Sequence, residues 1–160
     1  MLRAVALVAA SLFLLTVPVR ADDVSGHSGL ALAALVAANS PTLAASDKTT
    51  MAALFDGKTA GPFPAGKKIT VQADGVTCVA GNVDITHFSC DLTFGGKTVS
   101  LSGRQAHEIY ATMGEVGVPE DGAMGKIYEG LSHLACTVDP NEVKQASGEG
   151  VSCTFTPGVP

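Results

Sequence analysis

The clearest alternation of apolar and polar side chains runs from Phe88 to Phe94, with the period of a strand that has one buried face. Gly95 and Gly96 follow, and a Gly-Gly pair suits the two left-handed positions of a two-residue hairpin turn. Such a turn would place the apolar side chains of both strands on the same face. The pattern therefore predicts a β-hairpin with three facing pairs, Phe94 with Lys97, Leu92 with Val99 and Cys90 with Leu101.

An amphipathic helix is predicted directly after this hairpin. Ser102 and Gln105 have the spacing of a capping box, in which each side chain bonds a backbone N–H near the other residue. We expect the helix to end at Gly117 and to pack on the hairpin. Its apolar stripe has the helical spacing i, i+3, i+4 and i+7, at Ala106, Ile109, Tyr110 and Met113.

Three shorter apolar segments before the hairpin are predicted to be strands. Lys67–Ala73 and Val76–Ala80 are separated by a tight turn at residues 74–75. Val83–Thr86 leads into the hairpin, but the apolar parity shifts before Phe88. One extra residue near His87 would restore the parity, so we expect a β-bulge there.

Two helices are predicted in the N-terminal third, after a polar and mobile segment, Asp22–Ser28. The Ala- and Leu-rich run Leu30–Ala38 favours a helix by propensity. It could instead be a partner-binding or membrane-surface helix, but it lacks the basic face that such helices use. We therefore expect it to dock on the sheet of its own domain. The second helix is expected to have Ser46 as its N-cap, to end at Gly57, and to carry Met51, Leu54 and Phe55 on one side.

The C-terminal third is predicted to contain two further helices and two strands. Pro119 suits the first turn of a helix whose apolar side would be Ala123, Ile127, Tyr128 and Leu131. Asp139 and Glu142 have capping spacing for a brief helix. On either side of it, Leu134–Val138 and Val151–Phe155 alternate as strands.

These elements predict an α+β fold, because helices and strands are segregated along the chain and do not alternate. We expect a small antiparallel sheet of four to six strands packed against three to four helices. Residues 22–57 would form a helical N-terminal segment packed on the domain. Residues 58–160 would form the sheet plus helices of the same single domain.

The first 21 residues have the pattern of a cleaved secretory signal peptide. A short positive start, Met1–Arg3, precedes an apolar run from Ala4 to Val17, and the small residues Val19 and Ala21 suit a cleavage site. The alternative, a transmembrane anchor, would need about 20 apolar residues. We therefore expect cleavage after Ala21, no membrane span in the cleaved chain, and a periplasmic or extracellular location.

Cleavage would leave an acidic chain. The sequence has 10 Lys and Arg against 15 Asp and Glu, so loss of Arg3 and Arg20 leaves 8 basic residues and a net charge of −7. Without a cluster of Lys and Arg there is no positive face for phosphates, so nucleic acid is not an expected partner. The expected partner is an unknown protein or small-molecule ligand.

All four cysteines lie beyond the expected cleavage site, and an even number in an exported protein indicates two disulfides. Four cysteines allow three connectivities, and sequence alone does not choose among them. Strand alternation favours Cys78–Cys90 and Cys136–Cys153, because antiparallel pairing of the last two strands would place the second pair opposite each other. A redox pair or thiolate metal ligands are the alternatives, but no C-x-x-C motif is present.

Candidate catalytic residues lie on the predicted central helix without completing a motif. His107 and Glu108 match the first two positions of the zinc-protease motif H-E-x-x-H, but Ala111 occupies the second ligand's position. Tyr110 lies on the apolar side of the same helix, where core packing competes with ligand contact as its role. No metal or cofactor is expected, because metal-ligand spacing is lacking among the histidines, His27, His87, His107 and His133.

Two hypotheses about function follow, since the sequence has no nucleophile elbow, phosphate loop or haem-attachment motif. The first is an exported, non-catalytic binding or envelope-associated protein with its binding surface on the sheet or its loops. The alternative is a small enzyme or ligand carrier with a site around His107, Glu108 and Tyr110. A third possibility, a structural subunit of a larger assembly, predicts a large exposed apolar patch.

Overall fold

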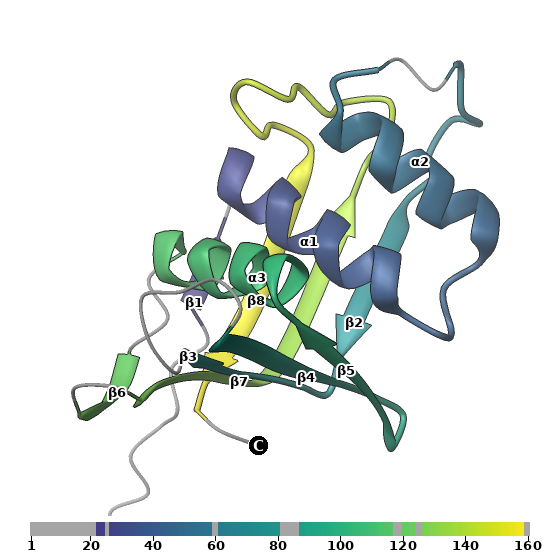
Figure 1. Ribbon diagram of the computed structural model, residues 1–160. Helices are drawn as coiled ribbons and strands as arrows, with labels where there is room; N and C mark the ends of the chain where they lie inside the picture. The colour runs from purple at the N-terminus through teal and green to yellow at the C-terminus, as the bar shows by residue number, and fades with distance from the viewer. Residues whose placement is uncertain are drawn as a thin grey trace, which may run out of the picture.

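The structure is a computed structural model (Figure 1). It describes residues 22–24, 26–58, 61–80, 87–116, 120–123 and 126–158, and for residues 22–24, 120–123 and 126–129 it describes the backbone alone. The elements in chain order are β1 (Asp22–Val24), α1 (His27–Asn39), α2 (Ala45–Phe55), β2 (Ile69–Ala73), β3 (Gly75–Ala80), β4 (Phe88–Phe94), β5 (Lys97–Ser102), α3 (Arg104–Glu115), β6 (Glu120–Ala123), β7 (Lys126–Val138) and β8 (Val151–Pro157).

The strands form one antiparallel sheet organised around the 13-residue strand β7. One edge of β7 pairs first with β6 and then with β8, while the other edge pairs first with β3 and then with β2. The main path across the sheet is β1-β8-β7-β3-β4-β5, so β1 and β5 are its outer strands. The fold therefore belongs to the predicted α+β class.

The predicted hairpin is confirmed as β4 and β5. Its register pairs Phe94 with Lys97, Leu92 with Val99 and Cys90 with Leu101. Gly95 and Gly96 have φ angles of 54° and 77°, the left-handed values that the turn requires. The turn is also held from outside the hairpin, because the carboxylate of Asp74 accepts a hydrogen bond from the Gly95 N–H.

Two disulfides join facing residues of neighbouring strands, with the pairing expected from strand alternation. Cys78 of β3 is bonded to Cys90 of β4, and Cys136 of β7 is bonded to Cys153 of β8. All four side chains are buried. The two bonds therefore fix β3 to β4 and β7 to β8 from the side of the sheet that faces the core.

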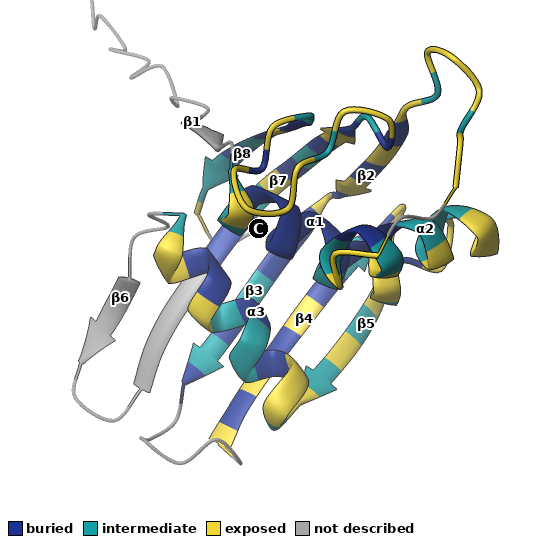
Figure 2. Ribbon diagram, turned by 90° about the horizontal axis from the view of Figure 1, so that it is seen from above, coloured by how far each residue is buried: buried dark blue, intermediate teal, exposed yellow. Residues whose placement is uncertain are grey.

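The three helices of the described chain lie on the same side of the sheet (Figures 1 and 2). Helix α1 contacts β2, β7 and β8 as well as both other helices, and it is buried over most of its circumference. A helix that is apolar all round belongs in a core, and its many alanines let the sheet and helices approach it closely. Helix α3 covers β3, β4 and β5, and buries three of its four predicted stripe residues, Ala106, Ile109 and Met113.

The predicted turn at residues 74–75 is wrong. Strands β2 and β3 lie end to end along β7, with Ala73 opposite Leu134 and Val76 opposite Leu131. Gly75 already belongs to β3 and is paired with Thr93. The length of β7 explains this arrangement, because it offers both short strands a partner without folding the chain back on itself.

The helix predicted to start at Pro119 is also wrong, since the chain from Glu120 onward forms the hairpin of β6 and β7. Each glycine costs a helix about 1 kcal/mol relative to alanine, and this stretch contains three. The misleading signals were Pro119 and the helical spacing of Ala123, Ile127, Tyr128 and Leu131. In the structure Leu131 is buried on strand β7, just before a β-bulge that shifts the register between Leu131 and His133.

Several predicted ends of elements need correction. Ser102 does not cap α3: it ends β5 opposite Ser89, and Gly103, with φ 61°, is the N-cap without a side-chain bond. Helix α2 has Ala44 as its N-cap, so Ser46 lies inside it. Residues 140–142 form a turn, not a brief helix.

The remaining differences concern the number and extent of elements. The part of the chain that the structure describes contributes eight strands to the sheet, more than the four to six expected. The first of them, Asp22–Val24, lies in a segment expected to be mobile. His87 directly precedes β4 and is not part of a strand. The predicted signal peptide, the predicted strand Val83–Thr86 and the predicted cap at Gly117 lie outside the described residues.

Candidate functional site

The three candidate residues of α3 do not line one common cavity. The rings of His107 and Tyr110 both lie against Phe88 of β4, with centroids 4.8 and 5.1 Å from its ring. The carboxylate of Glu108 accepts a hydrogen bond from Nε of Arg104 at 2.9 Å. His107 and Glu108 line a groove, and the residues that line it do not include Tyr110.

This groove lies among the three helices and has a volume of about 330 Å³. It is lined mostly by apolar groups from all three helices, Ala31, Leu35, Phe55 and Ala111, together with His107, Glu108 and Thr112. The Thr112 hydroxyl donates to the backbone carbonyl of Glu108 at 2.8 Å, so it is already used within the helix. The groove could therefore hold a small apolar body that carries one polar group.

The histidines lie in separate places in the structure. His27 donates from Nδ1 to the carbonyl of Gln145 at 3.1 Å and stacks on Phe55, whereas His133 is exposed on the sheet. Within the described ranges, no three or more His, Cys, Asp and Glu residues gather in a way that could hold a metal ion. His27 therefore has a packing role, and His133 lies on the surface.

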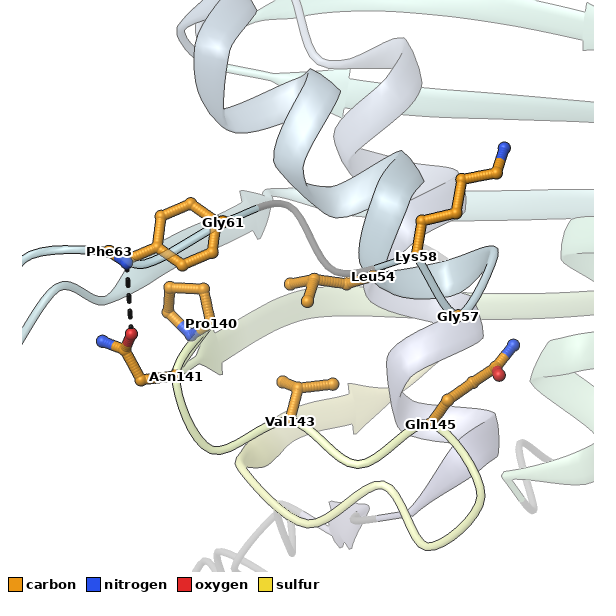
Figure 3. Close-up of a pocket in the computed structure, with 9 residues that line it drawn as sticks. All are labelled: Leu54, Gly57, Lys58, Gly61, Phe63, Pro140, Asn141, Val143 and Gln145. Carbon is orange, nitrogen blue, oxygen red and sulfur yellow. Dashed lines mark hydrogen bonds between the residues drawn. The ribbon is translucent and has the colours of Figure 1, made fainter.

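A second pocket, which the sequence did not indicate, lies where the end of α2 meets the loop 139–150 (Figure 3). Its volume is about 240 Å³. Leu54, Pro140 and Val143 turn their side chains toward the same space and make its apolar wall. The pocket is completed by Phe63, by the amides of Asn141 and Gln145, and by Gly57, Lys58 and Gly61.

One wall of this pocket is the C-terminal end of α2. Gly57 has a left-handed φ of 69°, and its N–H donates to the carbonyl of Leu54 at 3.1 Å. The N–H of Lys58 donates to the carbonyl of Ala53 at 2.8 Å, which completes a Schellman motif. A Cβ at Gly57 would clash with the amide of Gln145, so the absence of a side chain allows the loop to approach the helix.

Side-chain amides tie the loop 139–150 to the opposite wall. Gln145 donates from Nε2 to the carbonyl of Phe55 at 2.6 Å. Asn141 accepts from the N–H of Phe63 and donates to the carbonyl of Pro64, each at 3.3 Å. These bonds join the loop to the chain on both sides of the pocket, so its walls are fixed without a ligand.

The loop is also anchored at its far end. Gly148 is buried and lies so close to Gly26 that a Cβ at Gly148 would overlap the Gly26 backbone. Across the loop, Lys144 and Glu149 form a β-bridge and an ion pair of 2.6 Å. The hydrogen bond that Lys144 donates to the Glu149 carboxylate, and the negative charge of that carboxylate, raise the pKa of Lys144.

The face of the sheet opposite the helices is polar and rich in hydroxyl groups. Its exposed residues alternate with the buried core positions of β2, β4, β7 and β8 and with the half-buried Val99 and Leu101 of β5. They include Thr70, Gln72, Ser89, Asp91, Thr98, Ser100, Ser102, His133, Thr137 and Ser152. Among the residues of this face whose side chains the structure describes, none is an exposed aromatic on which a sugar or base could stack.

Sequence reasoning missed the pocket because its two halves are separated by about eighty residues and meet only through tertiary packing. The sequence patterns in these two segments indicated the ends of helices and gave no sign of a pocket. Gly57 ends α2 as predicted, whereas Asn141 lies between Asp139 and Glu142, the two residues predicted to cap a brief helix. Neither expectation indicated that the two segments would be neighbours.

In comparisons with known proteins, no family model, no curated protein and no solved structure matches this chain. Within the described residues, no helix has the length and apolar character needed to cross a membrane.

Proposed function

We propose that this chain is an exported, disulfide-bonded, non-catalytic binding protein of the periplasm or the extracellular space. Its binding site is the pocket between the end of α2 and the loop 139–150. The ligand is a small molecule, or a side chain of a partner protein, that presents a compact apolar group with an amide or similar hydrogen-bonding group.

Export is supported by the first 21 residues, which have the charge, apolar run and small residues of a secretory signal. It is also supported by the two buried disulfides, because such bonds persist in oxidising compartments and are rare in reducing ones. A domain that folds outside the cytoplasm benefits from cross-links that limit the freedom of its unfolded chain.

The observation that carries the binding function is the fixed architecture of the pocket. Gln145 and Asn141 bond to backbone groups of the facing segment, and Gly57 permits the close approach of the loop. A site whose walls are already ordered loses little conformational entropy when a ligand enters. The lining exposes more polar than apolar surface, so the one apolar wall and the facing amides would orient a ligand that carries both kinds of group.

The volume of the pocket indicates the size of its ligand. Drug-sized ligands occupy pockets of roughly 300–1,000 Å³. The observed volume of about 240 Å³ is smaller, so it suits a group the size of one amino-acid side chain. The wall of Leu54, Pro140 and Val143 favours a branched or aromatic apolar group.

This proposal can be tested by nuclear magnetic resonance on the ¹⁵N-labelled cleaved protein, with isobutyramide and phenylacetamide as probes. We expect shift changes concentrated at Gly57, Asn141 and Val143. Val143→Phe should fill the pocket and weaken probe binding at least tenfold, because the larger ring occupies the ligand's space.

The matched control is Val99→Phe, which enlarges a half-buried valine of β5 and should leave probe binding unchanged. Well-dispersed spectra of both variants would show that they fold. If neither probe shifts the pocket residues at millimolar concentration, or if Val143→Phe binds as well as the unchanged protein, the pocket is not the binding site.

The groove among the helices supports a second candidate, the ligand carrier with His107 and Glu108. The observation in its favour is a groove of about 330 Å³ with a largely apolar lining and one carboxylate. Such a lining would suit a small apolar amine. Tyr110 is not part of this candidate site, because its ring packs on Phe88 and the residue does not line the groove.

A further inference from the structure

We propose that the free edge of β5 is a strand-addition site for an extended segment of another polypeptide. This inference goes beyond the pocket and does not depend on it. It depends on the backbone groups of β5, on the different character of its two faces, and on the charges at its two ends.

The register of the hairpin shows which backbone groups of β5 are available. A two-residue turn makes Phe94 and Lys97 a hydrogen-bonded pair, and such pairs then recur at every second residue. The bond from the Gly103 N–H to the Phe88 carbonyl, at 2.9 Å, continues this series. The intervening residues Thr98, Ser100 and Ser102 therefore direct their N–H and C=O groups away from β4.

No described residue bonds to these outward backbone groups. β5 is the last strand on its side of the sheet, and Figure 2 shows it at the open edge, where the drawn helices leave its outer side free. Three residues that each offer one donor and one acceptor can pair with a five-residue strand. An unpaired edge of this kind is a template for an added strand.

The two faces of β5 differ in a way that specifies the side chains of an added strand. Val99 and Leu101 are half-buried on the face that carries α3, and they pack against the core. Thr98, Ser100 and Ser102 are exposed on the other face. An added strand would cover the two apolar side chains with its own apolar residues and place hydroxyl groups beside the other three.

The charges disfavour a second copy of this chain as the occupant. Antiparallel self-pairing centred on Ser100 would place Lys97 opposite Gly103 of the other copy, next to its Arg104. Both side chains are exposed; Lys97 forms no ion pair within the described chain, and Arg104 is paired through Nε with Glu108 of its own helix. Two such contacts per dimer would bring like charges together, whereas a strand with an acidic residue at each end would pair with Lys97 at one end and share Arg104 with Glu108 at the other.

The test uses a capped synthetic peptide, Glu-Thr-Val-Thr-Val-Thr-Glu, whose threonines would lie beside the hydroxyl face and whose valines would lie over Val99 and Leu101. We expect it to slow hydrogen exchange of the amides of Thr98, Ser100 and Ser102. Binding should weaken when the salt concentration is raised, because both flanking ion pairs are exposed.

The decisive variant is Ser100→Pro. Proline removes an N–H that the sheet does not use, so the strand should still pair with β4, as proline does on edge strands. We expect at least a tenfold loss of peptide affinity. Ser100→Ala is the matched control: it removes the hydroxyl that donates to Asp91, keeps the N–H, and should bind the peptide like the unchanged protein.

Two N-methylated peptides, one methylated on its valines and the other on its threonines, test the proposal with the unchanged protein, even if Ser100→Pro fails to fold. One of the two patterns should abolish binding and the other should not, because alternate amides face the edge. The proposal is overturned if the unmodified peptide does not bind at millimolar concentration, or if both N-methyl patterns bind equally. It is also overturned if sedimentation shows a dimer that Ser100→Pro dissolves.

Discussion

Two residues without side chains, Gly57 and Gly148, determine how the loop 139–150 sits on the helices. Both have left-handed φ angles, and a Cβ on either would meet atoms of another segment. At Gly148 those atoms belong to the backbone of Gly26, which has no rotamer to change. The pocket therefore depends on a close approach between the loop and the start of α1, as well as on its lining residues.

Gly148→Ala should be strongly destabilising, by at least about 2 kcal/mol, because both the backbone conformation and the close approach are lost. Gly96→Ala is the matched control: it also has a left-handed φ, but its added Cβ would meet no atom within 4 Å. It should cost only about 1 kcal/mol. Urea unfolding of the two variants measures the difference, and equal losses would show that the approach to Gly26 does not matter.

At the scale of elements, the loop 139–150 is stabilised across its width by an exposed ion pair between Lys144 and Glu149. Because the folded state raises the pKa of Lys144, this contribution is complete below the pKa of the unfolded chain. It is lost as the pH rises through the raised pKa of the folded state. An exposed pair contributes little, so the effect should be small but should have this sign.

Lys144→Met should therefore lower the melting temperature slightly at neutral pH. The difference from the unchanged protein should shrink as the pH rises toward and beyond about 10.4, the ordinary pKa of lysine. Melting curves of both proteins at a series of pH values measure it. A difference that grows with pH would contradict the assigned role of the ion pair.

Elements with strong local patterns could be predicted from the sequence. The alternation in Phe88–Phe94 and the two glycines after it determine one hairpin and its register, and the same reasoning indicated the facing cysteines. The apolar spacing in Arg104–Glu115 likewise predicted which side of α3 is buried. In each of these cases the signal lies within a few residues of the structure that it specifies.

Other elements depend on partners that are far away in the sequence. In the first half of strand β7, Ile127, Tyr128 and Leu131 have the spacing of a helix's apolar side. Its strand character comes from pairing with β2, β3, β6 and β8. The pocket was missed for the same reason, since Leu54 and Val143 become neighbours only after the sheet has brought α2 and the final loop together.

At the scale of the whole molecule, the chain is a sheet with helices on one side and a polar, hydroxyl-rich face on the other. The disulfides connect strands on the helix side of the sheet, and the bond between Cys136 and Cys153 closes the base of the loop 139–150. This division suits a binding protein: a cross-linked frame holds the pocket, and a free sheet edge is available for a second contact.

We propose that the chain is exported and that its four cysteines hold its frame together as two disulfides and carry out no reaction. The most direct measurement is the intact mass of the protein, expressed with its own leader, recovered from the periplasm of a bacterial host, and denatured in the presence of a thiol-alkylating reagent without reductant. The mass should be that of a chain beginning at Asp22, with no alkyl group added and two disulfides. Alkylated cysteines, or a chain that keeps its first 21 residues, would contradict the account.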